Sequence, residues 1–231
     1  MKLETLQKGQ ILLIDKPLHW TSFDIVNKLR HAILKKYNLK KFKVGHAGTL
    51  DPLATGLLMV FVGKATKKIS DFQNLDKEYT GTITLGATTP SYDMETPIDQ
   101  TFPFSHITPE MIEATAQKFI GKQQQKPPVF SAIKKNGKKL YEHARKGEEV
   151  DITSRPVEIK EFEILEINLP DIKFRTKVSK GTYIRSLAYD FGKALQSGGY
   201  LSELRRTKIG NFSVANAVSY QEWIDALKDE T

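Results

Sequence analysis

A tight loop from Gly45 to Gly56 runs directly into the apolar segment Leu57–Val62, and this junction constrains the fold more than any other part of the sequence. The glycines of the loop permit positive φ and a close approach to the backbone. Pro52 fixes its own φ and disfavours the helical conformation at Asp51. The six apolar residues that follow predict a buried strand. The fold must therefore hold one carboxylate rigidly at the end of a buried strand.

Asp51 can have several roles in such a loop. It can act as a nucleophile, a general base or a metal ligand, or it can be a turn residue bonded to its own backbone. The sequence does not favour a phosphate-binding loop of the G-x-x-x-x-G-K-S/T type, because the nearby Lys64 follows a lone glycine. No metal site is expected, because the chain lacks cysteine and its five histidines, at positions 19, 31, 46, 106 and 143, show no metal-ligand spacing.

The charge of the chain favours a polyanionic partner. Lys and Arg number 35 against 27 Asp and Glu, which gives a formal net charge of +8. The absence of cysteine excludes disulfides and thiolate chemistry and agrees with a reducing compartment. The apolar run Ile11–Ile14 is followed at once by Asp15, so it is too short for a signal sequence or a membrane span. We therefore expect a cytoplasmic protein with no membrane association.

Periodicity and turn signals predict strands and helices that do not alternate strictly. The expected strands are residues 11–14, 57–62, 77–89, 157–169 and 172–178. The expected helices are residues 22–37, 108–120, 138–145, 181–195 and 220–227, the last with Ser219 and Glu222 as a capping box. Such an order predicts an α+β fold built on a mixed sheet. A length of 231 residues permits one large core or two small ones.

The middle of the chain, from about residue 123 to 155, has the composition of an insertion. Residues 123–128 are rich in Gln and Pro, which predicts a break in regular structure, and Asn136–Gly137 is a hairpin-turn signal. Residues 127–147 can form a mobile basic clamp or an ordinary surface hairpin.

Three further side chains each admit two interpretations. Tyr79, near the start of a predicted strand, can stack on a base and relay a proton, or it can pack across the sheet. Arg185, on an apolar helix face, can pair with a buried carboxylate or extend to solvent. Leu204 begins a basic segment that can border a base pocket or form a solvated edge strand.

The loop sequence G-H-A-G-T-L-D-P-L-A-T-G resembles the signature of the TruB family of pseudouridine synthases. Other segments are similar to family motifs in the same order, and the resemblance extends from about Leu12 to Phe212. They are K-E-Y at 77–79, P-P-V-F-S-A-I-K at 127–134, S-K-G-T-Y-I-R-S at 179–186 and L-R-R-T at 204–207. The sequence departs from the family at His19, where a glycine is usual, and across residues 89–96, where T-D-T-x-D-x-x-G is usual.

The resemblance implies a mixed, mainly antiparallel sheet of the pseudouridine synthase fold, with flanking helices and an inserted thumb loop. It implies a single catalytic domain over residues 1–231 with the thumb at about 123–155. No full C-terminal RNA-binding domain is expected, because too few residues follow Ala217. The implied activity is the isomerisation of uridine at position 55, in the T loop of tRNA, to pseudouridine.

The resemblance also implies the roles of the site residues. Asp51 is the catalytic residue, Arg185 pairs with it, and Tyr79 stacks on the target uracil. Asp51 can act as a nucleophile or initiate deprotonation of the sugar, and the sequence leaves both open. Further substrate-binding residues are His46, which fills the gap left by the flipped nucleotide, Tyr183, which contacts the substrate, and Leu204, which borders the uracil pocket.

The expected partner is the T-stem loop of tRNA, bound by a monomer without a guide RNA. No cofactor is expected, because the reaction breaks one bond to the sugar and forms another without oxidation. A catalytically silent tRNA-binding or tRNA-folding protein remains an alternative, since it would keep the basic surfaces. A hydrolase that uses Asp51 with a second carboxylate is a further alternative, although no paired acid stands out by spacing.

Overall fold

The computed structural model describes residues 2–131, 133–135, 137–144, 146–148 and 150–229. They form two compact units, the first made of residues 1–79 and 205–231 and the second of residues 80–204. Two strands, β4 (Lys77–Leu85) and β12 (Gly199–Ile209), each contribute residues to both units. Each unit has its own core and is described below by itself.

The sheet of the first unit centres on β3 (Ala54–Val62), which pairs with two antiparallel neighbours. Strand β1 (Gln10–Lys16) pairs with it from Gln10 opposite Val62 to Lys16 opposite Gly56, and β2 (Val44–Ala47) pairs with its second half. The end of β12 follows β3 in the sheet. The remaining strands are β13 (Phe212–Ser213), antiparallel to β12, and β14 (Val218–Ser219), parallel to β1.

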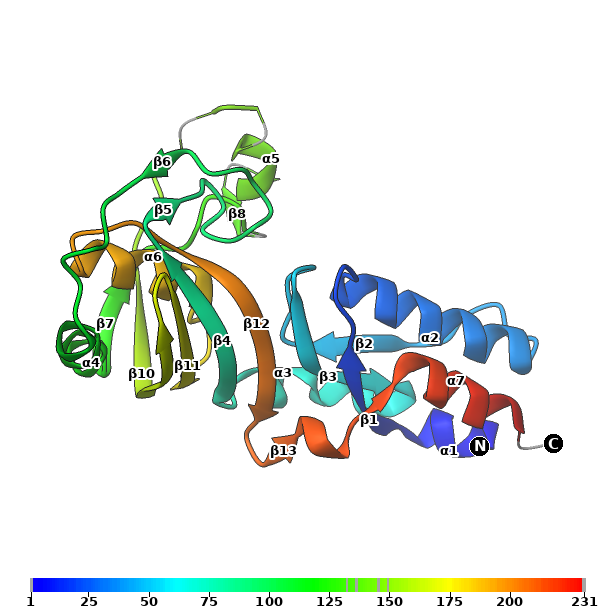
Figure 1. The fold of residues 1–231 in the computed structure, drawn as a ribbon. Coiled ribbons are helices and arrows are strands. Elements are labelled where there is room, and N and C mark those ends of the chain that lie inside the picture. Colours follow the sequence, from blue (N-terminus) through cyan, green and yellow to red (C-terminus); the bar gives the residue numbers. More distant parts are fainter. Residues whose placement is uncertain (1, 132, 136, 145, 149, 230–231) are drawn as a thin grey trace. The chain divides into compact units, whose positions relative to one another are not determined.

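Strand β3 is buried on both faces, because alternate residues enter two different cores. Leu58, Val60 and Val62 pack with helices α1 (Leu3–Lys8), α2 (Ser22–Lys36) and α7 (Tyr220–Asp229), the last two lying side by side in Figure 1. Leu57, Met59 and Phe61 pack near the short helices η1 (Gly63–Lys68) and α3 (Ile69–Gln73). All six of these strand residues are 0% exposed, as the continuous apolar run predicts.

The second unit contains a sheet in the order β12-β4-β11-β10-β7. The outer strands are β7 (Gly121–Gln125), β10 (Arg155–Asn168) and β11 (Asp171–Val178), and β10 is antiparallel to both of its neighbours. Helices α4 (Pro109–Lys118) and α6 (Ile184–Ala194) accompany this sheet (Figure 1). Its core contains a cluster of aromatic rings at centroid distances of 5.4–6.4 Å, formed by Phe119, Phe162, Phe174 and Phe191.

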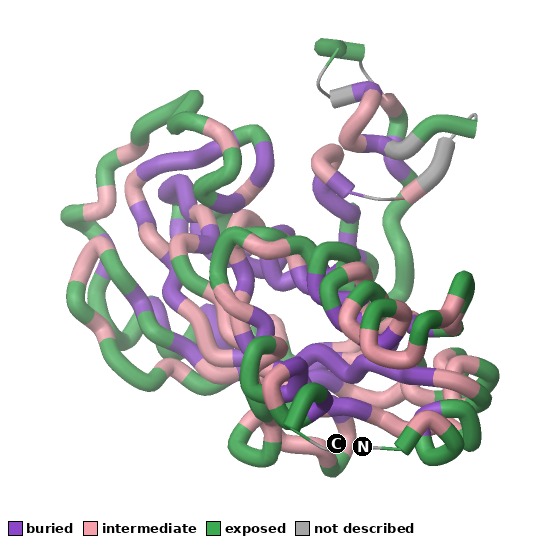
Figure 2. Tube along the Cα trace, turned by 90° about the vertical axis from the view of Figure 1, so that its right-hand side faces the viewer, coloured by how far each residue is buried: buried purple, intermediate pink, exposed green. Residues whose placement is uncertain are grey.

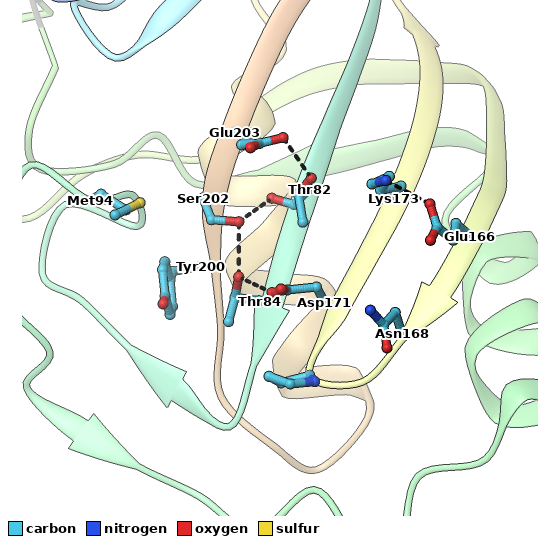
Figure 3. Close-up of a pocket in the computed structure, with 11 residues that line it drawn as sticks. Thr82, Thr84, Met94, Glu166, Asn168, Asp171, Lys173, Tyr200, Ser202 and Glu203 are labelled. Atoms are coloured by element: carbon cyan, nitrogen blue, oxygen red, sulfur yellow. Dashed lines mark hydrogen bonds and ion pairs between the residues drawn. The ribbon is translucent and has the colours of Figure 1, made fainter.

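The second unit also has a polar pocket of about 460 Å³ over strands β4, β10, β11 and β12 (Figure 3). Thr84 Oγ1 lies 2.7 Å from Asp171 Oδ1 and 2.8 Å from Ser202 Oγ. Lys173 Nζ lies 2.6 Å from Glu166 Oε2. Antiparallel sheets commonly bury one face and expose the other, and these hydroxyls and ion pairs satisfy each other on the exposed face. Figure 2 shows that buried residues gather in the interior of the chain trace and that exposed residues lie on its outer turns and loops.

Most predicted elements are confirmed, including the fold class, the helix α2, whose cap is Thr21, and the capping box of Ser219 with Glu222. The predicted break at residues 123–128 is wrong at its start, because Gly121–Gln125 forms β7 on the edge of the sheet. The predicted strand 77–89 is interrupted at Gly86, whose φ of 84° ends β4 before β5 (Ala87–Thr88). Helix α6 begins at residue 184 rather than 181.

The middle segment contains a small hairpin and a helix. Strands β8 (Lys134–Lys135) and β9 (Lys138–Lys139) pair across the predicted turn, and α5 (Leu140–Ala144) follows. Asn136 itself lies outside the described residues. Strand β6 (Gln100–Thr101) pairs with β5, and η2 (Val214–Asn216) follows β13. Within the described part of the chain, no helix is long and apolar enough to cross a membrane.

Gly192→Ala tests the packing of α6 on the strand that follows it. A Cβ at this position would lie 2.4 Å from the Gly199 nitrogen, a backbone atom that cannot swing away. The clash outweighs the gain of about 1 kcal/mol in helix propensity, so we expect the free energy of unfolding to fall by roughly 2 kcal/mol. Urea denaturation measures it. Lys193→Ala, at the exposed next position, is the control, and equal stability of both variants would contradict the packing argument.

Candidate active site

Helix α2 fixes the loop that carries Asp51. The Ser22 hydroxyl, at the start of α2, accepts a hydrogen bond of 2.8 Å from Leu50 N and lies 3.1 Å from Leu50 O. Ala54 N donates to Asp51 O at 3.0 Å, and His19 N donates to Pro52 O at 2.8 Å. The backbone is therefore held before, at and after Asp51 by contacts that do not use its carboxylate.

Arg206 holds the same loop from β12. Its Nε donates to Leu57 O at 2.8 Å and its Nη2 to Gly48 O at 3.0 Å, while Nη1 lies 3.5 Å from Thr49 O. The residue is 1% exposed. A buried guanidinium thus connects the loop on the N-terminal side of Asp51 to the strand on its C-terminal side.

Lys16 is a second buried cation in this unit. It is 0% exposed, and its Nζ donates to Pro17 O at 2.9 Å and to Trp20 O at 2.6 Å. The pKa of Lys16 is lowered to about 8, mainly by burial and to a smaller extent by the charge of Arg206, whereas the negative charge of Asp51 acts in the opposite direction. Lys16 and Arg206 therefore place two cationic side chains beside the loop that carries Asp51.

His46 and Tyr79 belong to the same unit as Asp51. His46, on β2, has a buried Nδ1 without a hydrogen-bond partner among the described residues. Burial and the charge of Arg206 lower the pKa of His46, so its imidazole is neutral at pH 7. Tyr79, on β4, is 8% exposed. Near it on β4, Lys77 donates to the carbonyls of Gln73 and Leu75, at 2.7 and 2.5 Å.

In the second unit, Arg185 lies in the first turn of α6 and is 4% exposed. Its Nη1 donates to Ser91 O at 3.1 Å, and its Nε lies 3.6 Å from Asp93 Oδ2. Asp93 is 5% exposed, and its Oδ1 accepts a hydrogen bond from Glu95 N at 3.0 Å. Asp93 was not among the predicted site residues, although it is the one aspartate retained from the altered T-D-T-x-D-x-x-G segment.

The loop that carries Asp93 is held by three further contacts. The ring of Tyr92 stacks on Tyr189 of α6 at a centroid distance of 4.1 Å, and Leu201 N donates to Tyr92 O at 2.9 Å. Thr89 Oγ1 donates to Asp93 O at 2.6 Å. Burial raises the pKa of Tyr92 to about 12. The loop is thereby fixed to both α6 and β12 within this unit.

Two other predicted site residues lie in the second unit. The backbone of Tyr183, just before α6, makes two bonds with the amide of Gln125: Tyr183 N donates to Oε1 at 2.8 Å, and Nε2 donates to Tyr183 O at 3.0 Å. Leu204 is half-buried on β12. The structure thus places Asp51, His46 and Tyr79 in the first unit. It places the other three predicted residues in the second unit: Arg185, Tyr183 and Leu204.

Comparison with known protein families decides the affiliation of the chain. A family model described as "TruB family pseudouridylate synthase (N terminal domain)" matches residues 35–184, which is more than half of the chain. A second model, described as "tRNA pseudouridylate synthase B C-terminal domain", matches residues 185–231. The chain belongs to the TruB family. It is therefore a pseudouridine synthase, an isomerase, as the motifs predicted.

Similar TruB-family proteins match along the whole chain. A protein of Flavobacterium johnsoniae named tRNA pseudouridine synthase B is 60% identical over 229 residues, which are 99% of this chain and 100% of that protein. A protein of Phocaeicola vulgatus with the same name is 53% identical over 97% of each chain. The resemblance first seen in separate motifs is thus confirmed over the full sequence.

Solved structures confirm the fold expected for the TruB family. The crystal structure of a Cbf5-Nop10-Gar1 complex contains a chain with 30% identity and a TM-score of 0.72, and the match covers 97% of this chain and 56% of that one. A structure of an H/ACA RNP bound to a substrate RNA containing 2′-deoxyuridine matches with 27% identity and a TM-score of 0.69. This chain thus spans a little over half of the solved chains.

Acidic residues and histidines form no cluster of three or more that could hold a metal ion in the described parts of the chain. The roles assigned to the individual site residues remain predictions. So does the proposed pairing of Arg185 with Asp51.

Asp93→Asn tests the buried ion pair of the second unit. Asparagine keeps the shape and the hydrogen bond to Glu95 N but removes the negative charge that lies 3.6 Å from the Arg185 Nε. Removing one charge of a buried ion pair is strongly destabilising, so we expect the free energy of unfolding to fall by about 3 kcal/mol. Urea denaturation measures the change. The exposed Asp171→Asn is the control, with an expected loss below about 1 kcal/mol. Equal losses would contradict a special role for the buried pair.

Lys16→Met tests the buried ammonium through the pH dependence of stability. Because the pKa falls from 10.5 to about 8 on folding, the unfolded chain binds more protons between these pH values, and stability rises with pH. We expect Lys16 to contribute a rise of about 2 kcal/mol between pH 8 and 9.5. Urea denaturation over this range should show the rise in the wild type and a curve flatter by this amount in Lys16→Met. Parallel curves would show that Lys16 does not titrate there.

Proposed function

We propose that this protein converts uridine at position 55, in the T loop of tRNA, to pseudouridine. The observation that carries the proposal is Asp51, which lies in the full family signature and whose loop is held by Ser22, His19 and Arg206 without use of the carboxylate. The names of full-length relatives at 60% and 53% identity support tRNA as the substrate. The net charge of +8 suits an RNA partner.

The chemistry needs one carboxylate and no change in oxidation state. The N1–C1′ bond breaks, the uracil rotates, and a C5–C1′ bond forms, after which C5 loses its proton and N1 gains one. Asp51 begins the reaction, either by attack as a nucleophile or by removing a proton from the sugar. Tyr79 stacks on the uracil, and Arg185 acts in the same reaction as the cation that keeps the carboxylate ionised and oriented.

Substrate binding requires the target nucleotide to leave the stack of the T loop. Unstacking costs a few kcal/mol and is offset by contacts in the pocket. His46 fills the space left by the flipped base, and its neutral, half-buried imidazole suits insertion among bases. Tyr183 and Leu204 contact the extruded uridine. The thumb, at about residues 123–155, closes over the T stem-loop.

The protein works alone, as a cytoplasmic monomer with a single catalytic domain, and needs no guide RNA, metal or cofactor. Support for independence from a guide RNA comes from the tRNA synthases that match the whole chain. The chain of the H/ACA structure bound to substrate RNA is only 27% identical, so this chain is more similar to the tRNA synthases than to that chain.

Mapping of pseudouridine by carbodiimide in a tRNA transcript tests the proposal. Wild-type protein, without metal or cofactor, should produce one pseudouridine, in the T loop. Asp51→Asn should lower turnover by at least about a thousandfold, which corresponds to roughly 4 kcal/mol. Asp71→Asn, at an exposed position of the same unit, is the control and should retain wild-type turnover.

Other outcomes would identify the alternatives. Turnover of Asp51→Asn within tenfold of wild type would remove Asp51 from its role. Tight tRNA binding without modification by the wild type would indicate a binding or folding protein. Release of free uracil would indicate a hydrolase.

A further inference from the structure

Arg206 is the largest side chain among the fully buried residues of the described chain. Its three contacts with described residues are all backbone carbonyls, those of Gly48, Thr49 and Leu57, at 3.0, 3.5 and 2.8 Å. Buried charges are normally paired with an opposite charge, because their desolvation is costly. Arg206 is buried without an ion pair to any described residue in spite of this desolvation cost. This indicates that its hydrogen bonds to the three carbonyls have a function.

The three carbonyls lie on both sides of Asp51 in the chain. Gly48 and Thr49 precede it in the loop, and Leu57 follows it on β3. A guanidinium presents its donors in a rigid planar fork, so it can fix the distance between two backbone segments. The positions of these two segments determine the position of the Asp51 Cα and the direction of its side chain.

The backbone of Arg206 is itself in close contact with β3. A Cβ at Gly56, whose φ is 102°, would lie 2.3 Å from Arg206 O and 2.8 Å from Arg206 N. Only glycine permits this approach, so Gly56 brings β12 directly against the end of the loop. The backbone of Arg206 is thereby fixed, so its guanidinium cannot move with the loop.

We propose that Arg206 is a positioning residue for the formation of pseudouridine: its guanidinium clamps Gly48 and Thr49 to β3 and so sets the orientation of Asp51. The inference rests on the proposed catalytic role of Asp51. The clamp acts on the chemical step rather than on tRNA binding, because Arg206 is buried and its described contacts are all within the protein. A displacement of about 1 Å at a reacting group can reduce the rate a hundredfold.

Two substitutions test the clamp. Arg206→Lys keeps the charge but replaces the planar fork with a single ammonium, which cannot bridge the loop and the strand in the same way. Arg206→Met fills the space without a buried charge, a change that proteins often tolerate. We expect kcat to fall at least about a hundredfold in both variants, with KM for the tRNA transcript within threefold of wild type.

Arg30→Lys is the matched control. Arg30 is a half-buried arginine of the same unit, and its Nη2 donates to a backbone carbonyl, that of Val44, at 3.2 Å. This carbonyl is on β2 rather than on the Asp51 loop. Arg30→Lys also weakens an arginine contact with a backbone carbonyl, but it should leave kcat within threefold of wild type. Circular dichroism and thermal melting establish that each variant is folded.

The result that overturns the inference is a folded Arg206 variant with kcat within threefold of wild type. A loss of fold in both variants would also overturn it, since Arg206 would then serve folding rather than positioning. Asp51→Asn is measured beside them to separate this inference from the proposed function. If Asp51→Asn is inactive and Arg206→Lys is active, only the clamp is wrong. If Asp51→Asn is active, the proposed role of Asp51 is wrong as well.

Discussion

The burial of β3 on both faces is the constraint on which the first unit depends. Its residues from Leu57 to Val62 are completely inaccessible, and they alternate between the core under α2 and α7 and the core near α3. A strand packed in this way cannot slide or twist without opening two cores at once. Strand β3 therefore fixes the end of the loop at Gly56, and Asp51 lies five residues before Gly56.

The two units solve the problem of buried cations in different ways. In the second unit, Arg185 has the carboxylate of Asp93 at 3.6 Å and a carbonyl at 3.1 Å. In the first unit, Lys16 and Arg206 donate their hydrogen bonds to backbone carbonyls. Carbonyl dipoles satisfy the donors but do not cancel the charge, and the lowered pKa of Lys16 reflects this. The positive charge of these two side chains favours an anion in the loop that carries Asp51.

The sequence was informative where apolar patterns were continuous and uninformative where polar residues were buried. The strand at 57–62 was predictable because every residue is apolar. Strand β12 was difficult to predict, because Arg205, Arg206 and Lys208 suggest a solvated edge, yet Arg206 is 1% exposed. Strand β7 was predicted as irregular because of its glutamines. A single-sequence pattern does not show that Gln125 Oε1 and Nε2 would pair with the backbone of Tyr183.

The candidate site shows the same division. Asp51, Tyr79 and Arg185 were predicted as site residues from motifs, whereas Asp93, which forms an ion pair with Arg185, was not singled out because its surrounding motif is altered. Its role depends on a contact between residues 92 positions apart, which local sequence cannot indicate.

One departure from the family pattern lies at a residue with positive φ, and a second residue with positive φ lies within the altered segment 89–96. His19 has φ of 65° at the position of the usual glycine, and Tyr92 has φ of 64° in the altered segment. A non-glycine residue in this region carries a strain of order 1 kcal/mol, so it persists only where neighbouring contacts over-determine the conformation. His19 donates its N–H to Pro52 O, and Tyr92 accepts at its carbonyl from Leu201 N while its ring stacks on Tyr189. His19 therefore keeps the turn beside Asp51 although it stands where the family usually has glycine. The contacts that stabilise the two strained residues also hold the loops of the candidate site in place.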